Sequence, residues 1–143
     1  MGLRIVLADD NQQMRAAVHD VLAQAGLDVI ASLGDGAGAL AAAIEHRPDV
    51  VVMDVEMTGG GPDLAQRLVA LSPAPRVMVF SGRDDADTVL RMLAAGATGY
   101  VAKGVLGEDL AACVRRCAEG VFFVAADCAD GVRARLSQTM SMV

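Results

Sequence analysis

The segment LRIVLADD, residues 3–10, carries an apolar run directly into two aspartates, Asp9 and Asp10. Three later apolar runs also end at a polar residue: they are DVVVM before Asp54, RVMVF before Ser81 and GYVA before Lys103, the only lysine of the chain. Short apolar runs bounded by turn residues are typical of strands buried on both faces, which occur mainly in parallel sheets. Ligands of open parallel sheets bind beyond the carboxyl ends of the strands, so we expect these polar residues to share one edge.

The segments between the apolar runs have apolar residues at helical spacing. Residues from about 12 to 25 carry apolar side chains at helical spacing, and Gly26 closes this stretch. The segment LDVIASL, residues 27–33, reads as a further strand, and a helical pattern follows each later strand. The chain therefore contains five strand–helix units in order. Right-handed crossovers with helices on both faces predict a doubly wound α/β domain.

Composition limits the class of protein. A chain of 143 residues with a formal charge of −6 fits one domain with a sizeable core. This acidity argues against a general nucleic-acid-binding surface, which requires a basic patch. Three cysteines, an odd number, with no signal peptide and no long apolar stretch indicate a cytoplasmic protein without a membrane span.

Three glycines, Gly34, Gly36 and Gly38, lie at the start of the second predicted helix. Glycines at a helix start can cradle phosphates, but the dinucleotide fingerprint belongs after the first strand, where this chain has its two aspartates. We therefore interpret the glycines as a turn.

The order of the polar residues resembles the receiver domain of response regulators, the aspartate-phosphorylated half of two-component signalling, from about Leu3 to Glu119. The matching elements are the acidic pair after the first strand, Asp54 after the third, Ser81 after the fourth and Lys103 after the fifth. The segment GATGYVAKG, residues 96–104, is similar to the same segment in receivers of the nitrate-regulator, or LuxR, type.

The resemblance implies a flavodoxin-like receiver fold, with a five-stranded parallel sheet in the order 2-1-3-4-5. Residues 1–120 would form the receiver domain. Residues 121–143 would form a C-terminal linker or a short sixth helix, and a strand and helix that pack on the domain edge are the alternative for this segment.

The resemblance also implies the chemistry of the site. Asp54 would be the phosphoacceptor, and the chain would catalyse only its own phosphorylation and dephosphorylation rather than act as an enzyme on other molecules. The cofactor would be Mg²⁺, bound by Asp9, Asp10, Asp54 and the backbone carbonyl of Glu56. Because three like charges repel one another, we expect the metal-free domain to be strained at this point.

Further residues have roles that the resemblance implies. Ser81 and Lys103 would contact the phosphoryl group. Phosphorylation would draw Ser81 inward and let Tyr100 turn in, and this switch would alter the surface of the fourth helix and fifth strand. Glu56 and Arg83 would tune the lifetime of the phosphorylated form. Their side chains would either pair across the entrance of the site or both be solvated.

The implied partners are a sensor histidine kinase, a C-terminal DNA-binding domain outside this chain and a second copy of the chain in a homodimer. The chain itself is expected to contact neither a membrane nor nucleic acid.

Two other functions fit parts of the pattern. One is a receiver-like interaction module that works without phosphorylation, because Thr58 and the glycines of residues 59–61 are atypical after Asp54 and predict a mobile loop. The other is a phosphohydrolase of the haloacid-dehalogenase type, which also uses an aspartyl phosphate, a Ser or Thr and a Lys. In that class the metal-binding acidic pair follows the lysine, whereas here it precedes Asp54, so the order favours a receiver.

Overall fold

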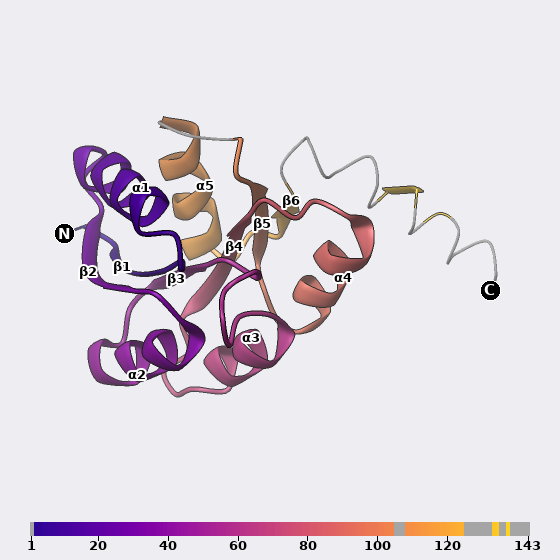
Figure 1. The fold of residues 1–143 in the computed structure, drawn as a ribbon, viewed down its shortest axis with the longest axis horizontal. Helices are drawn as coiled ribbons and strands as arrows, with labels where there is room; N and C mark the ends of the chain where they lie inside the picture. The colour runs from indigo at the N-terminus through magenta and orange to yellow at the C-terminus, as the bar shows by residue number, and fades with distance from the viewer. Residues whose placement is uncertain (1, 105–107, 125–132, 135–136, 138–143) are drawn as a thin grey trace.

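One parallel sheet with helices on both faces forms the framework of the protein (Figure 1). The structure, a computed structural model, describes residues 2–104, 108–124, 133–134 and 137. The strands are β1 (Arg4–Ala8), β2 (Asp28–Leu33), β3 (Val50–Met53), β4 (Arg76–Ser81), β5 (Gly99–Ala102) and β6 (Phe123–Val124). The helices are α1 (Gln12–Gln24), α2 (Gly36–His46), α3 (Pro62–Val69), α4 (Ala86–Ala94) and α5 (Glu108–Ala118).

The strand order is β2-β1-β3-β4-β5-β6, and every neighbouring pair is parallel. This confirms the doubly wound fold and the predicted order of the first five strands. Strand β6 adds a sixth strand at the β5 edge, in agreement with the alternative of a strand that packs on the domain edge. Strand β6 belongs to the segment 121–143, and most of the sixth helix predicted there lies outside the described residues.

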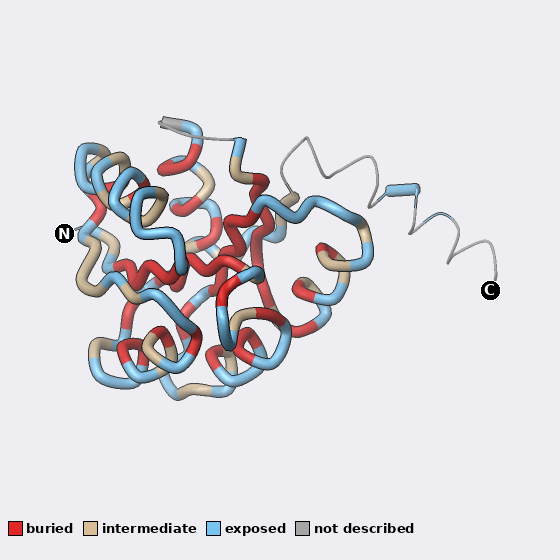
Figure 2. Tube along the Cα trace, viewed as in Figure 1, coloured by how far each residue is buried: buried red, intermediate tan, exposed pale blue. Residues whose placement is uncertain are grey.

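Apolar side chains alternate between the two faces of the sheet and make two buried layers. Figure 2 shows that the central strands and parts of the helices are buried. Ile5 and Leu7 belong to the buried layer that contains residues of α1 and α5, whereas Val6 and Ala8 belong to the layer on the other face, which contains residues of α2, α3 and α4. All residues of β3 and β5 are buried because both of their faces are covered, which explains the continuous apolar runs. Within the described ranges, no helix is both long enough and apolar enough to cross a membrane.

Strand β6 lies against β5 because Gly99 leaves room for an aromatic ring. Phe123 is the register partner of Gly99, and a side chain built on Gly99 would stand 2.4 Å from the Phe123 ring. The Arg116 guanidinium covers the same ring at 5.7 Å from its centroid, a cation–π contact. The added strand means that β5 is an internal strand of the sheet.

The N-terminus of α2 packs directly on the loop after β3. The Gly36 N–H donates to the Thr58 carbonyl at 2.8 Å, and a side chain built on Gly36 would stand 2.0 Å from the Gly59 oxygen. Gly36 opens α2, which confirms the predicted start of the second helix, and its missing side chain lets two backbones touch. The mobility of the loop stays a prediction, although these contacts restrain it.

Replacing Gly36 by Ala should lower the free energy of unfolding by about 1–3 kcal/mol, the usual cost of forcing extra atoms into a packed site. Chemical denaturation followed by circular dichroism measures this change. Gly34→Ala is the matched control, because its methyl group would meet only the end of the flexible Arg15 side chain, at 3.3 Å. The control should stay within about 0.5 kcal/mol of the wild type. Equal stability of the two variants would contradict the contact between α2 and the loop.

Candidate functional site

The carboxyl edge of the sheet gathers the polar residues that end the apolar runs. Asp9 and Asp10 follow β1, Asp54 follows β3, Ser81 ends β4 and Lys103 follows β5. Backbone hydrogen bonds continue past the strands: the Asp54 N–H donates to the last carbonyl of β1 at 3.1 Å, and the Lys103 N–H donates to the Ser81 carbonyl at 2.9 Å. The sheet itself therefore brings the predicted residues together.

The Lys103 ammonium lies between two buried carboxylates. Its Nζ atom is 2.7 Å from Asp54 Oδ2 and 2.9 Å from Asp9 Oδ2. Both aspartate side chains are only 4% exposed, whereas Lys103 is 20% exposed. Burial by itself lowers the pKa of Lys103, but the hydrogen bonds to Asp54 and Asp9 outweigh it and hold the pKa above its ordinary value. The ammonium is therefore fully charged at neutral pH.

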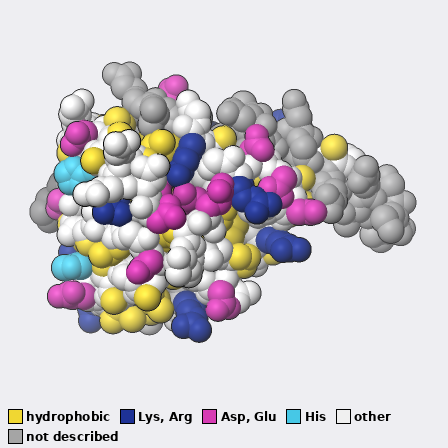
Figure 3. Space-filling view, in the orientation of Figure 1, with side chains coloured by type: hydrophobic (Ala, Val, Ile, Leu, Met, Phe, Trp, Pro, Cys, Tyr) yellow, Lys and Arg dark blue, Asp and Glu magenta, His cyan; other side chains and the backbone are white. Residues whose placement is uncertain are grey.

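A third carboxylate completes an acidic cluster. Asp10 is exposed, and one oxygen each of Asp9, Asp10 and Asp54 lies within 4.8 Å of the others. Acidic side chains gather near the middle of the face drawn in Figure 3, with basic side chains beside them. Three carboxylates and one ammonium leave a net charge of −2 (−3 + 1) in the cluster. Carboxylate oxygens in this number and spacing fit a divalent cation such as Mg²⁺.

Two tight turns orient the buried carboxylates. The Asn11 N–H donates to Asp9 Oδ1 at 2.9 Å, and the Glu56 N–H donates to Asp54 Oδ1 at 3.0 Å. In each aspartate, the other oxygen contacts Lys103. The Glu56 side chain is exposed, and the role of its backbone carbonyl as a metal ligand stays a prediction.

The two predicted switch residues meet at the backbone of Arg83. Ser81 is fully buried, and its Oγ accepts a hydrogen bond from the Arg83 N–H at 3.2 Å. Tyr100 is also fully buried, and its hydroxyl donates to the Arg83 carbonyl. Tyr100 thus already occupies the inward position that we expected phosphorylation to favour.

The pairing of Glu56 with Arg83, one of the two alternatives, is not present. Arg83 Nε lies 3.2 Å from Asp85 Oδ1 instead. Asp85 is fixed at that place because it caps α4, accepting hydrogen bonds from the N–H and hydroxyl of Thr88, and the bond from the hydroxyl lowers the pKa of Asp85. Glu56 and Arg83 both line a groove of about 250 Å³ between α4 and the loop after β3. Their role in tuning a lifetime stays a prediction.

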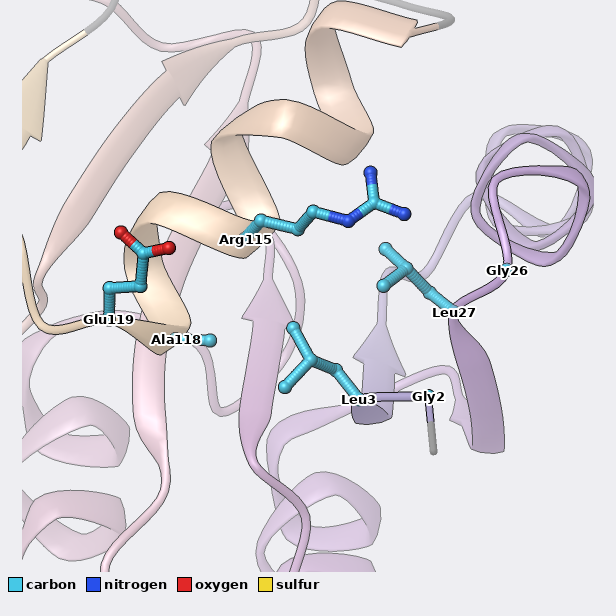
Figure 4. A pocket seen from close by; sticks show the side chains of 7 residues that line it. All are labelled: Gly2, Leu3, Gly26, Leu27, Arg115, Ala118 and Glu119. Carbon is cyan, nitrogen blue, oxygen red and sulfur yellow. The ribbon is translucent and has the colours of Figure 1, made fainter.

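A cavity of about 500 Å³ lies at the opposite edge of the sheet (Figure 4). Figure 4 shows Leu3 and Leu27 facing the gap, the Arg115 side chain extending across it and Glu119 pointing away. None of the predicted polar residues lines this cavity. We therefore place the candidate functional site at the acidic cluster rather than in this cavity.

Two residues that the sequence analysis did not single out support the cluster. Asn11 caps α1 by accepting a hydrogen bond from the Met14 N–H, while its own N–H holds Asp9. Arg15 Nη1 donates to the Asp9 carbonyl at 2.7 Å. An Asn before a helical stretch is a preferred N-cap, so the sequence carries a signal for Asn11. The sequence carries no signal for Arg15, because the partner of Arg15 is a backbone atom.

Comparisons with known proteins agree with this geometry. A family model described as the response regulator receiver domain matches residues 5–115. The chain is 43% identical, over 104 residues, to the protein-glutamate methylesterase/protein-glutamine glutaminase of Haloarcula marismortui, covering 71% of this chain and 28% of that protein. It is 34% identical, over 115 residues, to the DNA-binding transcriptional activator DevR/DosR of Mycobacterium tuberculosis, covering 79% of this chain and 53% of that protein.

A solved structure agrees as well. The signal receiver domain of the response regulator NarL from Mycobacterium tuberculosis superposes with a TM-score of 0.79 at 32% identity, covering 83% of this chain and 98% of that chain. The resemblance to receivers of the nitrate-regulator type is thereby confirmed. The chain spans 28% and 53% of the two curated relatives described above, so it matches only a part of each.

Asp54→Asn should raise the melting temperature of the metal-free protein. The substitution removes one of three like charges, and it leaves an amide oxygen that Lys103 can still contact. A gain of about 1 kcal/mol would raise the melting temperature by about 4 °C. Scanning calorimetry in excess chelator measures this shift.

The control for this experiment is Asp28→Asn, an exposed carboxylate at the start of β2, which changes the net charge by the same amount. It should leave the melting temperature nearly unchanged. An unchanged or lower value for Asp54→Asn would contradict a repulsive cluster.

Proposed function

We propose that this chain, which belongs to the response regulator receiver family, accepts a phosphoryl group on Asp54 from the phosphohistidine of a sensor kinase. The observation that carries the proposal is the contact of Asp54 Oδ2 with the Lys103 ammonium, at 2.7 Å, beside a second buried carboxylate. Phosphoryl transfer depends mainly on positioning and on charge neutralisation. A fixed carboxylate beside a fixed cation supports both.

In the proposed reaction, a carboxylate oxygen of Asp54 attacks the phosphorus atom while the bond from phosphorus to the kinase histidine nitrogen breaks. The product is an acyl phosphate on Asp54. Lys103 would move its contact from the carboxylate to a phosphoryl oxygen, as a compact point charge. The Ser81 hydroxyl now accepts from the Arg83 N–H, so its hydrogen is available to donate to a second phosphoryl oxygen.

The acidic cluster would hold Mg²⁺ through Asp9, Asp10 and Asp54, with the backbone carbonyl of Glu56 as a further ligand. When bound, the ion would offset negative charge on the phosphoryl oxygens. Its three carboxylate ligands lie within 4.8 Å of one another before any ion is added, which supports this assignment.

The output of the proposed switch is the surface formed by α4 and β5. Tyr100 lies on β5, and its hydroxyl is bonded to the Arg83 carbonyl in the loop that leads into α4. We propose that inward and outward positions of Tyr100 coexist before phosphorylation, and that phosphorylation shifts the population inward. Arg83 would transmit this shift, because its backbone contacts both Ser81 and Tyr100.

The relatives suggest how the signal is used. The relative from Mycobacterium tuberculosis is named a DNA-binding transcriptional activator, and the chain spans 53% of it. We therefore propose that this receiver acts in the cytoplasm on a DNA-binding domain outside the chain, with a second copy of the chain as a further partner. The activity named for the methylesterase is not carried over, because the chain spans only 28% of that protein.

Incubation with acetyl phosphate and Mg²⁺ should add the mass of one phosphoryl group to the wild-type chain and none to Asp54→Asn. Intact-mass spectrometry measures this difference, and peptide mapping after borohydride reduction locates the modified residue. Asp28→Asn should be labelled like the wild type. A folded wild-type chain that accepts no phosphoryl group would favour the phosphorylation-independent module, and repeated turnover of a generic phosphate monoester would favour the phosphohydrolase.

Phosphorylation should reduce the quenching of Tyr100 fluorescence by acrylamide. The chain has one tyrosine and no tryptophan, so its intrinsic fluorescence reports on Tyr100 alone. Asp54→Asn, treated in the same way, should show no change. A fully phosphorylated wild type with unaltered quenching would contradict the Tyr100 switch while leaving phosphorylation of Asp54 intact.

A further inference from the structure

Asp9 and Asp10 adjoin in the chain but are restrained very differently. Asp9 is held at four atoms: its N–H donates to the Leu33 carbonyl, its carbonyl accepts from Arg15, Oδ1 accepts from the Asn11 N–H and Oδ2 contacts Lys103. The Asp10 side chain is exposed, and no hydrogen bond or ion pair of that side chain is present among the described residues. The position of the Asp10 carboxylate therefore depends on its backbone.

The Asp9 carbonyl controls that backbone. The carbonyl of Asp9 and the N–H of Asp10 belong to one planar peptide group, so a bond that holds the carbonyl also fixes the rotation of the plane from which Asp10 departs. The donor is Arg15 Nη1, at 2.7 Å from the Asp9 oxygen. A guanidinium donating to a carbonyl makes a charge-assisted bond, which is stronger than a bond between neutral groups.

The position of Arg15 on α1 allows its side chain to reach the Asp9 carbonyl. It lies in the first turns of α1, and its own N–H donates to the carbonyl of the N-cap residue Asn11 at 2.9 Å. Its side chain is half-buried and runs beside Gly34, where a built side chain would stand 3.3 Å from Arg15 Nη1. The Arg15 side chain thus has a defined position between α1 and the loop after β2.

Two other arginines make the same kind of bond at the opposite edge of the sheet. Arg4 Nη1 donates to the Arg47 carbonyl at 3.1 Å, and Arg115 Nη2 donates to the Ala25 carbonyl beside the cavity of Figure 4. These bonds join elements far from the carboxylates. Arg4 therefore offers an internal control, because removing it deletes one positive charge and one guanidinium–carbonyl bond without touching the acidic cluster.

We infer that Arg15 is a positioning residue for magnesium binding, and that its bond to the Asp9 carbonyl sets the place of the Asp10 carboxylate. The inference rests on the proposed function, since it assigns Mg²⁺ to the acidic cluster. A positive charge near a cation site by itself weakens binding of the cation, so a purely electrostatic role for Arg15 predicts tighter binding when the charge is removed. A positioning role predicts weaker binding.

Isothermal titration of Mg²⁺ into the wild type and single variants separates the two roles. Arg15→Met should raise the dissociation constant about tenfold, the lower end of the effect that removal of a group orienting a metal ligand usually has. Arg15→Lys keeps a donor of similar reach and should recover most of the affinity. Arg4→Met should bind Mg²⁺ like the wild type, and its loss of thermal stability in chelator should be similar to that of Arg15→Met.

The outcomes distinguish this inference from the proposed function. A wild type that does not bind Mg²⁺, or binds it equally well as Asp54→Asn, overturns the proposed metal site and the inference with it. If Asp54→Asn weakens binding but Arg15→Met binds as tightly as the wild type or tighter, only the role of Arg15 is overturned. Should Arg15→Met fail to fold, Arg15→Gln, which is neutral and too short to reach the Asp9 carbonyl, takes its place with the same expected loss.

Discussion

The double ion pair of Lys103 with Asp54 and Asp9 constrains the whole carboxyl edge of the sheet. The lysine follows β5, and the two aspartates follow β3 and β1, so a single ammonium ties together three strands of the sheet. Removing charges from water is costly, and their attraction offsets this cost only where further hydrogen bonds satisfy them. Each carboxylate here also accepts a backbone N–H, and the lysine keeps part of its surface in water. The apolar layers stabilise the fold, whereas the ion pairs define a site on it.

Loops rather than strands set the finer spacing at this edge. The loop after β2 and the first residue of α2 lie between the two loops that carry the carboxylates. On one side Gly34 lies beside the Arg15 side chain, which holds the Asp9 carbonyl, and on the other side Gly36 touches the backbone of Thr58 and Gly59. A side chain at Gly36, the first residue of α2, would therefore push α2 away from the loop that follows Asp54. This explains how the acidic site can depend on a glycine that contacts no ligand itself.

The sequence predicted what periodicity and strand ends encode. Buried strands, helices on both faces and the common edge of the polar residues follow from apolar runs and their terminators, because a parallel sheet places all carboxyl ends together. A sixth strand was one of two alternatives for residues 121–143, because a two-residue strand has no periodicity and depends on the space that Gly99 leaves for Phe123. For Arg83 the sequence left two alternatives, a pair with Glu56 or a solvated side chain, and did not suggest Asp85. Asp85 is near in sequence and is fixed by its capping role, so it forms the ion pair in place of Glu56.

Contacts between side chains and backbone atoms were the part of the structure that the sequence predicted least well. Sequence patterns report side-chain types, whereas Arg15 bonds to a carbonyl and Gly36 acts through an absent side chain. The proposed switch would also act through backbone atoms. The Ser81 hydroxyl has one hydrogen and can accept and donate at once, so it can hold the Arg83 N–H while donating to a phosphoryl group that brings a charge of about −1.5 to −2. Any shift of Ser81 toward that charge then moves the Arg83 backbone, and with it the carbonyl that holds the Tyr100 hydroxyl. In the proposed switch, phosphorylation and the position of the tyrosine would therefore be coupled through the backbone of Arg83.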